Sequence, residues 1–198
     1  MKKKRIRWTL FGFALLLLLI NWVFPFSPLS LKKSIRYGGD QILVDDYRSE
    51  LKTFKMEYET RLKQQRKDEF IKDLTTNDVE YLLQMYELPW LVNKDSITIT
   101  KKTLTDMEFE VKEAKDTLIN LAFQEEYSEN TKVYLHSLLT ETLSLEKEID
   151  ELKHHSSLHP RSMIDLQLRN LHVHFISNFR MLSTFYQEHL RSKKKLEH

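Results

Sequence analysis

Glycine is almost absent from this chain, and its absence restricts what most of the sequence is able to form. All three glycines precede residue 40, so residues 40–198 contain none. Pro89 and Pro160 are the two prolines in that stretch. Without glycine, a chain does not readily form tight hairpins, phosphate-binding loops or the nucleophile elbow of a hydrolase. Together with a content of 30% charged residues, this composition predicts long helices.

Apolar residues recur at helical spacing along most of this glycine-free region. Between residues 135 and 152 the spacings alternate between 3 and 4, which is the heptad pattern of coiled coils and helical bundles. The residues of this heptad seam are Leu135, Leu138, Thr142, Leu145, Ile149 and Leu152. Similar stripes run from Tyr47 to Leu62 with a continuation through Phe70 and Ile71, from Val79 to Tyr86, from Met107 to Leu121, and from Ile164 to Tyr186.

These stripes predict an all-α fold, an antiparallel bundle of about four to five helices behind an N-terminal transmembrane helix. Polar residues just ahead of the stripes are the expected N-caps, because their side chains accept hydrogen bonds from the first backbone N–H groups. We expect Asp45 or Asp46 to cap the first helix of the bundle. Thr105 and Ser128 are the expected caps of two later helices.

The N-terminus combines a basic tail with an apolar segment. Residues 1–7 carry five positive charges and no negative charge, and residues 8–24 are almost entirely apolar. Seventeen helical residues extend over roughly 26 Å, close to the thickness of a thin bilayer core. Trp8 and Trp22 stand where interfacial aromatic residues belong. The segment from Trp8 to Phe26 therefore predicts a single-pass transmembrane signal-anchor.

A cleaved secretory signal is the alternative interpretation of the same segment. Signal cleavage requires small residues at an accessible extended site, and here Ser27 and Ser30 stand beside prolines or bulky residues. The uncleaved anchor is the preferred interpretation, and a secreted form is the alternative. Basic residues are in excess before the segment, which predicts a cytoplasmic N-terminus, an extracytoplasmic body and a location in the cell membrane.

The expected domain organisation follows from these boundaries. Residues 1–7 form a cytoplasmic tail, residues 8–26 the anchor, residues 27–40 a tether, and residues 41–195 the helical bundle. Residues 196–198 resemble the start of an affinity tag.

The charge balance and the residue types present exclude several classes of function. After residue 31 the chain has 26 basic and 29 acidic side chains, so it gives no reason to expect nucleic-acid binding. With no cysteine and no glycine loop, we predict no catalytic residues, no enzymatic activity and no cofactor. Glu151 and His154 form a single Glu-x-x-His pair, whereas a dimetal site in a bundle needs two such pairs. We therefore predict no metal site.

The segment from Pro89 to Thr103 lacks helical periodicity and is longer than most connections in bundles. It carries five apolar residues that are unusual for a solvated linker: Trp90, Leu91, Val92, Ile97 and Ile99. These residues bind a protein partner or fold back as a plug on the bundle, and the sequence leaves both open. Residues 97–100 alternate like a short strand, for which we expect a hairpin or flap and no sheet.

The sequence contains no motif of a known activity, so the expected function follows from topology. We expect an interaction module, acting as a scaffold, adaptor or regulatory subunit, whose partner is another protein of a bacterial envelope complex. The alternative is an extracytoplasmic module that senses a small ligand or binds a glycan. A polar cavity between helices favours the alternative, whereas a filled core with exposed apolar side chains favours a protein partner.

Overall fold

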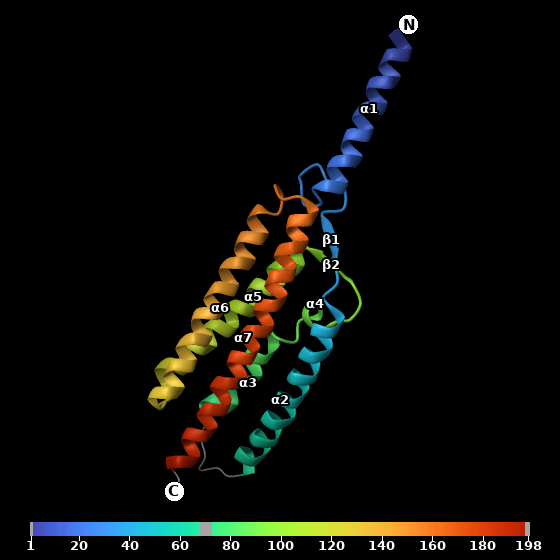
Figure 1. Ribbon diagram of the computed structural model, residues 1–198. Coiled ribbons are helices and arrows are strands. Elements are labelled where there is room, and N and C mark those ends of the chain that lie inside the picture. Colours follow the sequence, from blue (N-terminus) through green and yellow to red (C-terminus); the bar gives the residue numbers. More distant parts are fainter. Residues whose placement is uncertain (1, 68–72, 197–198) are drawn as a thin grey trace.

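The computed structural model describes residues 2–67 and 73–196 of the chain. The elements in chain order are α1 (Lys2–Val23), β1 (Ser34–Tyr37), α2 (Gln41–Lys67), α3 (Leu74–Gln84), α4 (Pro89–Val92), β2 (Ile97–Thr100), α5 (Lys101–Gln124), α6 (Glu129–His155) and α7 (Arg161–Leu196). Helices dominate, so the predicted helical bundle is confirmed. Figure 1 shows α1 projecting from one end of an elongated body formed by the other elements. The predicted continuation through Phe70 and Ile71, and the tag-like Glu197 and His198, lie outside the described residues.

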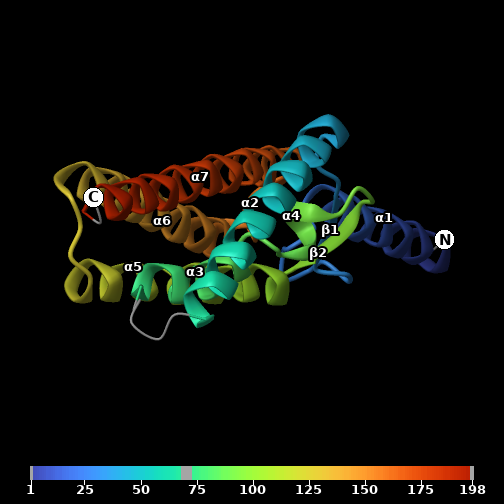
Figure 2. The ribbon, with the colours of Figure 1, turned by 90° about the horizontal axis from the view of Figure 1, so that it is seen from below.

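Three long helices form the larger part of the body. α6 packs on α5 along one side and on α7 along another, and α3 packs on α5 (Figure 2). Every residue of the predicted heptad seam on α6 is buried. The polar member, Thr142, is satisfied because its hydroxyl donates to the carbonyl of Leu138 at 2.8 Å. The periodicity of α6 therefore marks its buried face correctly.

Aromatic side chains join α2 to α7. The ring of Phe179 on α7 meets those of Tyr47 and Phe54 on α2, with centroids 5.4 and 5.6 Å apart. Tyr86, just after α3, contacts the same ring at 5.4 Å. Such edge-to-face contacts are favourable beyond the area they bury. The bundle thus contains the four long helices and the short α3 that the stripes predict, together with the one-turn α4.

Several helices begin earlier than predicted, and the predicted caps are wrong there. α2 begins after Asp40, whose carboxylate accepts from the N–H groups of Ile42 and Leu43 at 2.9 and 3.1 Å. α5 begins after Thr100, which exchanges hydrogen bonds with Thr103 in a capping box. Apolar periodicity locates the buried face of a helix, but the first turn is set by whichever residue satisfies its N–H groups. For α6 the predicted cap Ser128 is confirmed, with Thr131 N–H donating at 3.3 Å.

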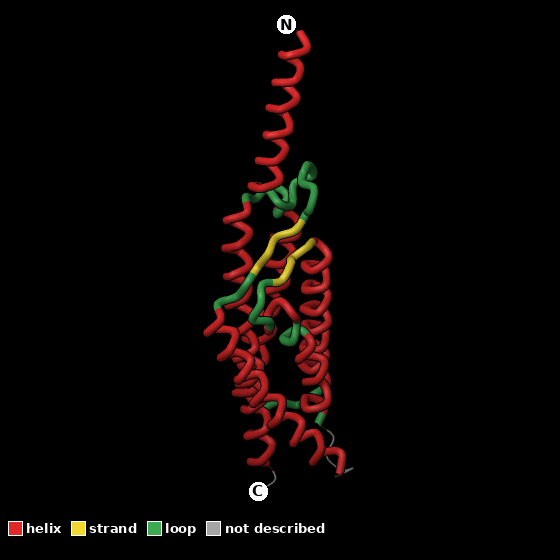
Figure 3. Tube along the Cα trace, turned by 90° about the vertical axis from the view of Figure 1, so that its right-hand side faces the viewer, coloured by secondary structure: helices red, strands yellow, loops and turns green. Residues whose placement is uncertain are grey.

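The prediction that excluded a sheet is wrong. β1 and β2 form a two-stranded antiparallel sheet in which Ile35 pairs with Ile99 (Figure 3). The partner strand lies within residues 27–40, which were expected to be a tether. Ile35 and Tyr37 are buried in the core, as is Phe26 just before this segment. The chain between α1 and α2 is therefore built into the body.

Within the described residues, no helix is both long and apolar enough to cross a membrane. The structure therefore does not support the transmembrane helix predicted over residues 8–26. One reason is that α1 ends at Val23 and Phe26, the last residue of the predicted span, packs in the core of the body. The apolar portion of α1, from Trp8 to Val23, extends over roughly 24 Å, which is shorter than the roughly 30 Å hydrocarbon core of a typical bilayer.

Leu145→Asp tests the seam on α6. The side chain of Leu145 is fully buried, so the substitution places an unpaired charge in the core and should lower the free energy of unfolding by several kcal/mol. The neighbouring residue Ser144 is exposed, and Ser144→Asp is the matched control that should leave stability within about 0.5 kcal/mol. Urea unfolding of the full chain measures both changes. Equal stability of the two variants would contradict the assignment of the buried face.

Candidate functional site

The five residues of the predicted partner-binding segment lie mainly in the interior. Trp90, Leu91 and Ile99 are buried, whereas Val92 and Ile97 are half-buried. The ring of Trp90 lies 5.2 Å from that of Phe175, centroid to centroid, in an edge-to-face contact. The structure does not bring these residues together as an exposed surface. Their burial is what the plug alternative predicts, and their binding of a partner stays a prediction.

Trp90 belongs to a buried cluster with Tyr37 and His172. The Tyr37 hydroxyl and His172 Nδ1 are hydrogen-bonded at 2.9 Å. Burial lowers the pKa of His172 to about 4 and raises the pKa of Tyr37 to about 12, so both groups are neutral at physiological pH. His172 Nε2 and Trp90 Nε1 have no hydrogen-bond partner among the described residues.

Gly39 is required by this cluster. A Cβ atom at Gly39 would lie 2.6 Å from His172 Cε1, a distance at which something must shift. Gly39 lies within residues 27–40, the predicted tether, and its lack of a side chain lets the chain pass against the imidazole ring. No spacing in the sequence connects Gly39 with His172, because the two residues meet only in the folded chain.

A second polar cluster lies where α3 begins, α5 ends and α7 approaches its C-terminus. His189 Nε2 and Lys193 Nζ lie 2.9 and 3.2 Å from the same Asp73 carboxylate oxygen. Lys193 Nζ is also 3.3 Å from Glu125 Oε1. Burial raises the pKa of Asp73, but hydrogen bonds from His189 and Thr76 and the charge of Lys193 outweigh it and hold the pKa far below its usual range. Asp73 is thus ionised and paired.

The ligand atoms of Asp73, Glu125 and His189 lie close enough together to hold a metal ion. The Lys193 ammonium already lies between the two carboxylates and pairs with both, and a divalent cation would have to displace it. Asp73 also caps α3, because its carboxylate accepts from Thr76 N–H. We therefore assign the cluster a structural role, joining three helices. The sequence alone does not predict this cluster, because Asp73 and His189 are 116 positions apart in the chain.

His174 connects α7 to α6. Its two ring nitrogens lie 3.0 Å from a Glu148 oxygen and 2.7 Å from a Glu141 oxygen. The hydrogen bonds with Glu148 and Glu141 raise the pKa of His174 despite partial burial. The His174 ring, bonded to two carboxylates of α6, supports the pairing of these helices.

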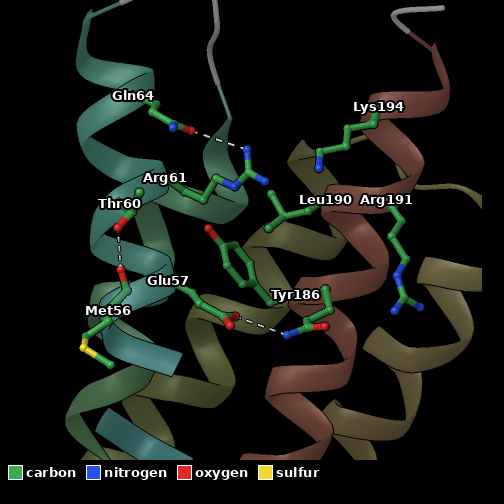
Figure 4. Close-up of a pocket in the computed structure, with 10 residues that line it drawn as sticks. Met56, Glu57, Thr60, Arg61, Gln64, Tyr186, Leu190, Arg191 and Lys194 are labelled. Carbon is green, nitrogen blue, oxygen red and sulfur yellow. Dashed lines mark hydrogen bonds between the residues drawn. The ribbon is translucent and has the colours of Figure 1, made fainter. Parts of the chain in front are cut away.

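An open groove lies between α2 and α7 toward their C-terminal ends (Figure 4). Its volume is about 610 Å³, and a hydrogen bond of 3.3 Å between Gln187 and Glu57 crosses it. Figure 4 shows the side chains of Arg61 and Lys194 extending toward one another above Leu190. Polar and basic side chains thus line a space of a size typical for small ligands.

From Trp8 to Trp22, α1 carries exposed apolar side chains on all sides. Trp8 and Trp22 are each 67% exposed. The other exposed large apolar residues of α1 are Leu10, Phe11, Phe13, Leu15, Leu16, Leu18 and Leu19. At about 100° per residue, these positions surround the helix axis. A helix that is hydrophobic all round is normally buried in a protein core or in a membrane, and here the body leaves it uncovered (Figure 3).

No protein-family model, curated protein or solved structure matches this chain. Its function must therefore be argued from the surfaces described above.

Trp90→Ala distinguishes a plug from a binding flap. Because Trp90 is buried against Phe175 and His172, we expect its truncation to lower the free energy of unfolding by about 3–5 kcal/mol. Val92→Ala, at a half-buried position of the same turn, is the control and should cost clearly less. Denaturant unfolding monitored by circular dichroism measures both. A Trp90→Ala protein that keeps its stability but fails to capture a partner would contradict the plug and support the binding flap.

Proposed function

We propose that this protein is a membrane-anchored interaction module, with α1 as its anchor and the helical body presented outside the cytoplasm. The exposed apolar surface of α1 carries the proposal. Because its exposed apolar side chains surround the helix axis, contact with a single partner helix leaves much of this surface in water. A lipid environment covers it on every side.

Helix length and flanking charge are compatible with this role. The apolar portion of α1 is short, but long basic side chains next to it can extend to the headgroups, and a bilayer thins locally around a short segment. Residues 2–7 supply five such side chains on the N-terminal side. Their excess over the opposite flank favours a cytoplasmic N-terminus. The location of the body follows from this orientation.

Exposed apolar side chains on α7 support a protein partner for the body. Met163, Leu166 and Val173 are 44%, 57% and 55% exposed. Their spacings of 3 and 7 residues place them on one face of the helix. Three large apolar groups aligned on the exposed side of this helix favour contact with another protein, here another component of an envelope complex. The buried Trp90 and Leu91 do not take part in this contact.

The alternative is the sensing of a small anionic ligand in the groove between α2 and α7. The basic residues Arg61, Arg191 and Lys194 at its rim favour this second function. The groove is open to solvent, whereas most ligand sites enclose the greater part of their ligand. For this reason the interaction module remains the primary proposal.

Anchorage by α1 is tested by cell fractionation. Leu16→Asp with Leu18→Asp places two charges in the middle of α1 and should move the protein from the membrane fraction to the soluble fraction, because a charge at the bilayer centre costs about 2.5–3.5 kcal/mol. Ile42→Asp is the control, since Ile42 is exposed on α2 and outside the anchor. Membrane retention of the doubly charged variant would contradict the proposal.

The partner surface is tested by photo-crosslinking in native membranes. A photoreactive amino acid at Leu166 should yield a specific crosslinked species, because this exposed residue lies in the middle of the apolar face of α7. The same group at the exposed residue Glu113 on α5 is the control. Equal crosslinking at the two positions would exclude α7 as the partner surface and would favour ligand sensing.

A further inference from the structure

The end of the body from which α1 emerges carries exposed leucines on two ordered loops. One loop follows α1, and in it Leu29 and Leu31 are 59% and 86% exposed. The other is the turn between α6 and α7, where Leu158 is 75% exposed. Figure 1 shows both loops at the same end of the body, next to the C-terminal end of α1. We call this region the α1-proximal end.

Positive charge accompanies these leucines. Residues 24–39 contain Lys32, Lys33 and Arg36 and no acidic residue. Residues 152–164 contain Arg161 and Lys153, of which Lys153 pairs with Glu108 of α5, and again no acidic residue. Lys32, Lys33 and Arg161 are exposed. The combination of exposed leucines and basic side chains matches the interface of an anionic bilayer, where acyl chains lie beneath phosphate groups.

The loop after α1 is held beside the last turn of that helix. Asn21 Oδ1 accepts a hydrogen bond from the Ser30 hydroxyl at 2.8 Å and one from Leu31 N–H at 2.9 Å. On the other side, the burial of Phe26 attaches the same loop to the body. The backbone of Leu31 therefore lies at the level of Asn21 along α1, one residue before the exposed Trp22 in that helix. A bilayer that contains α1 up to Trp22 has Leu31 at its surface.

The opposite end of the body carries charges of both signs. The connection between α5 and α6 contains Glu125 and Glu126, and Lys193 near the end of α7 pairs with Glu125 at 3.3 Å. Phe123, at the end of α5, is as exposed as Leu31, at 86%. The acidic residues of this connection distinguish it from the two loops of the α1-proximal end, which contain basic residues and no acidic ones.

We propose that the α1-proximal end binds the surface of an anionic phospholipid bilayer. Leu29, Leu31 and Leu158 enter the interface between headgroups and acyl chains. Lys32, Lys33 and Arg161 contact lipid phosphates. This inference rests on the proposed anchorage by α1 and adds a second contact, which sets the body upright on the membrane instead of leaving it hinged on α1.

The experiment uses the full chain in liposomes and a depth-dependent fluorescence measurement. The protein contains no cysteine, so a single substitution gives a single labelling site. Leu31→Cys and Leu158→Cys report on the α1-proximal end, and Phe123→Cys is the control with the same exposure as Leu31. Leu18→Cys reports on α1 itself. Each variant carries an environment-sensitive fluorophore, and the bilayer contains phosphatidylglycerol and a lipid with a nitroxide near its headgroup.

We expect quenching at positions 31 and 158 to be several-fold stronger than at position 123. Replacing phosphatidylglycerol by phosphatidylcholine should weaken it, as should combining Lys32→Gln, Lys33→Gln and Arg161→Gln, because both changes remove the attraction between the body and the lipid surface. These three side chains are exposed, so the melting temperature should not change.

The outcomes separate this inference from the proposed anchorage. If position 18 is quenched but positions 31 and 158 are quenched no more strongly than position 123, the surface contact is overturned and the anchorage by α1 stands. No quenching at position 18 would overturn both. Quenching at positions 31 and 158 that does not respond to the three charge-neutralising substitutions would overturn the assignment of the basic residues to lipid phosphates.

Discussion

The buried aromatic face of α7 is the interaction on which the rest of the body depends. Phe175 packs against Trp90 of α4, and Phe179 packs against Tyr47 of α2 and Tyr86 just after α3. Phe185 packs against Tyr127, between α5 and α6. Each ring contributes a large buried area and a preferred edge-to-face geometry, so one helix contacts several elements of the body at once. α6 covers a further side of α7. Loss of α7 would therefore leave α2, α4 and the sheet without a common support.

Polar groups on the same helix fix how these elements are aligned. His172 pairs with Tyr37 of β1, Asn178 with Tyr86, and His189 with Asp73. A shift of α7 by one turn would keep much of the apolar contact but would separate all three pairs at once. Each buried polar group left without a partner costs about 1–3 kcal/mol, so the pairs together disfavour the shifted arrangement strongly. Apolar burial stabilises the bundle, and the three polar pairs determine the position of α7 along its axis relative to its neighbours.

The sequence predicts the buried faces well because helical periodicity is a local property. The seam from Leu135 to Leu152 and the stripe on α7 are both buried as expected. The caps of α2 and α5 are local, and the predictions of them are wrong because periodicity does not locate the first turn of a helix. The other failures have a common cause, since each depends on a contact between distant residues. β1 is recognisable only beside β2, the cluster of Asp73 and His189 joins opposite parts of the chain, and Gly39 is needed only because His172 lies against it. For the candidate surfaces, the sequence identifies α1 as apolar, but the exposure of Leu31 and Leu158 on one end of the body requires the structure.

The length of α7 connects the membrane argument with the choice between a protein partner and a small ligand. α7 begins at the α1-proximal end and runs to the far end over 36 residues, roughly 54 Å. If that end rests on a bilayer, the apolar face around Leu166 lies close to the lipid surface, within reach of another membrane protein. The groove around Leu190 lies roughly 36 Å farther along the helix, where solutes arrive from the aqueous phase. The two candidate surfaces therefore face different surroundings. A rigid body upright on the membrane would bring Leu166 to membrane partners, whereas a body hinged on α1 would not hold it at any fixed height.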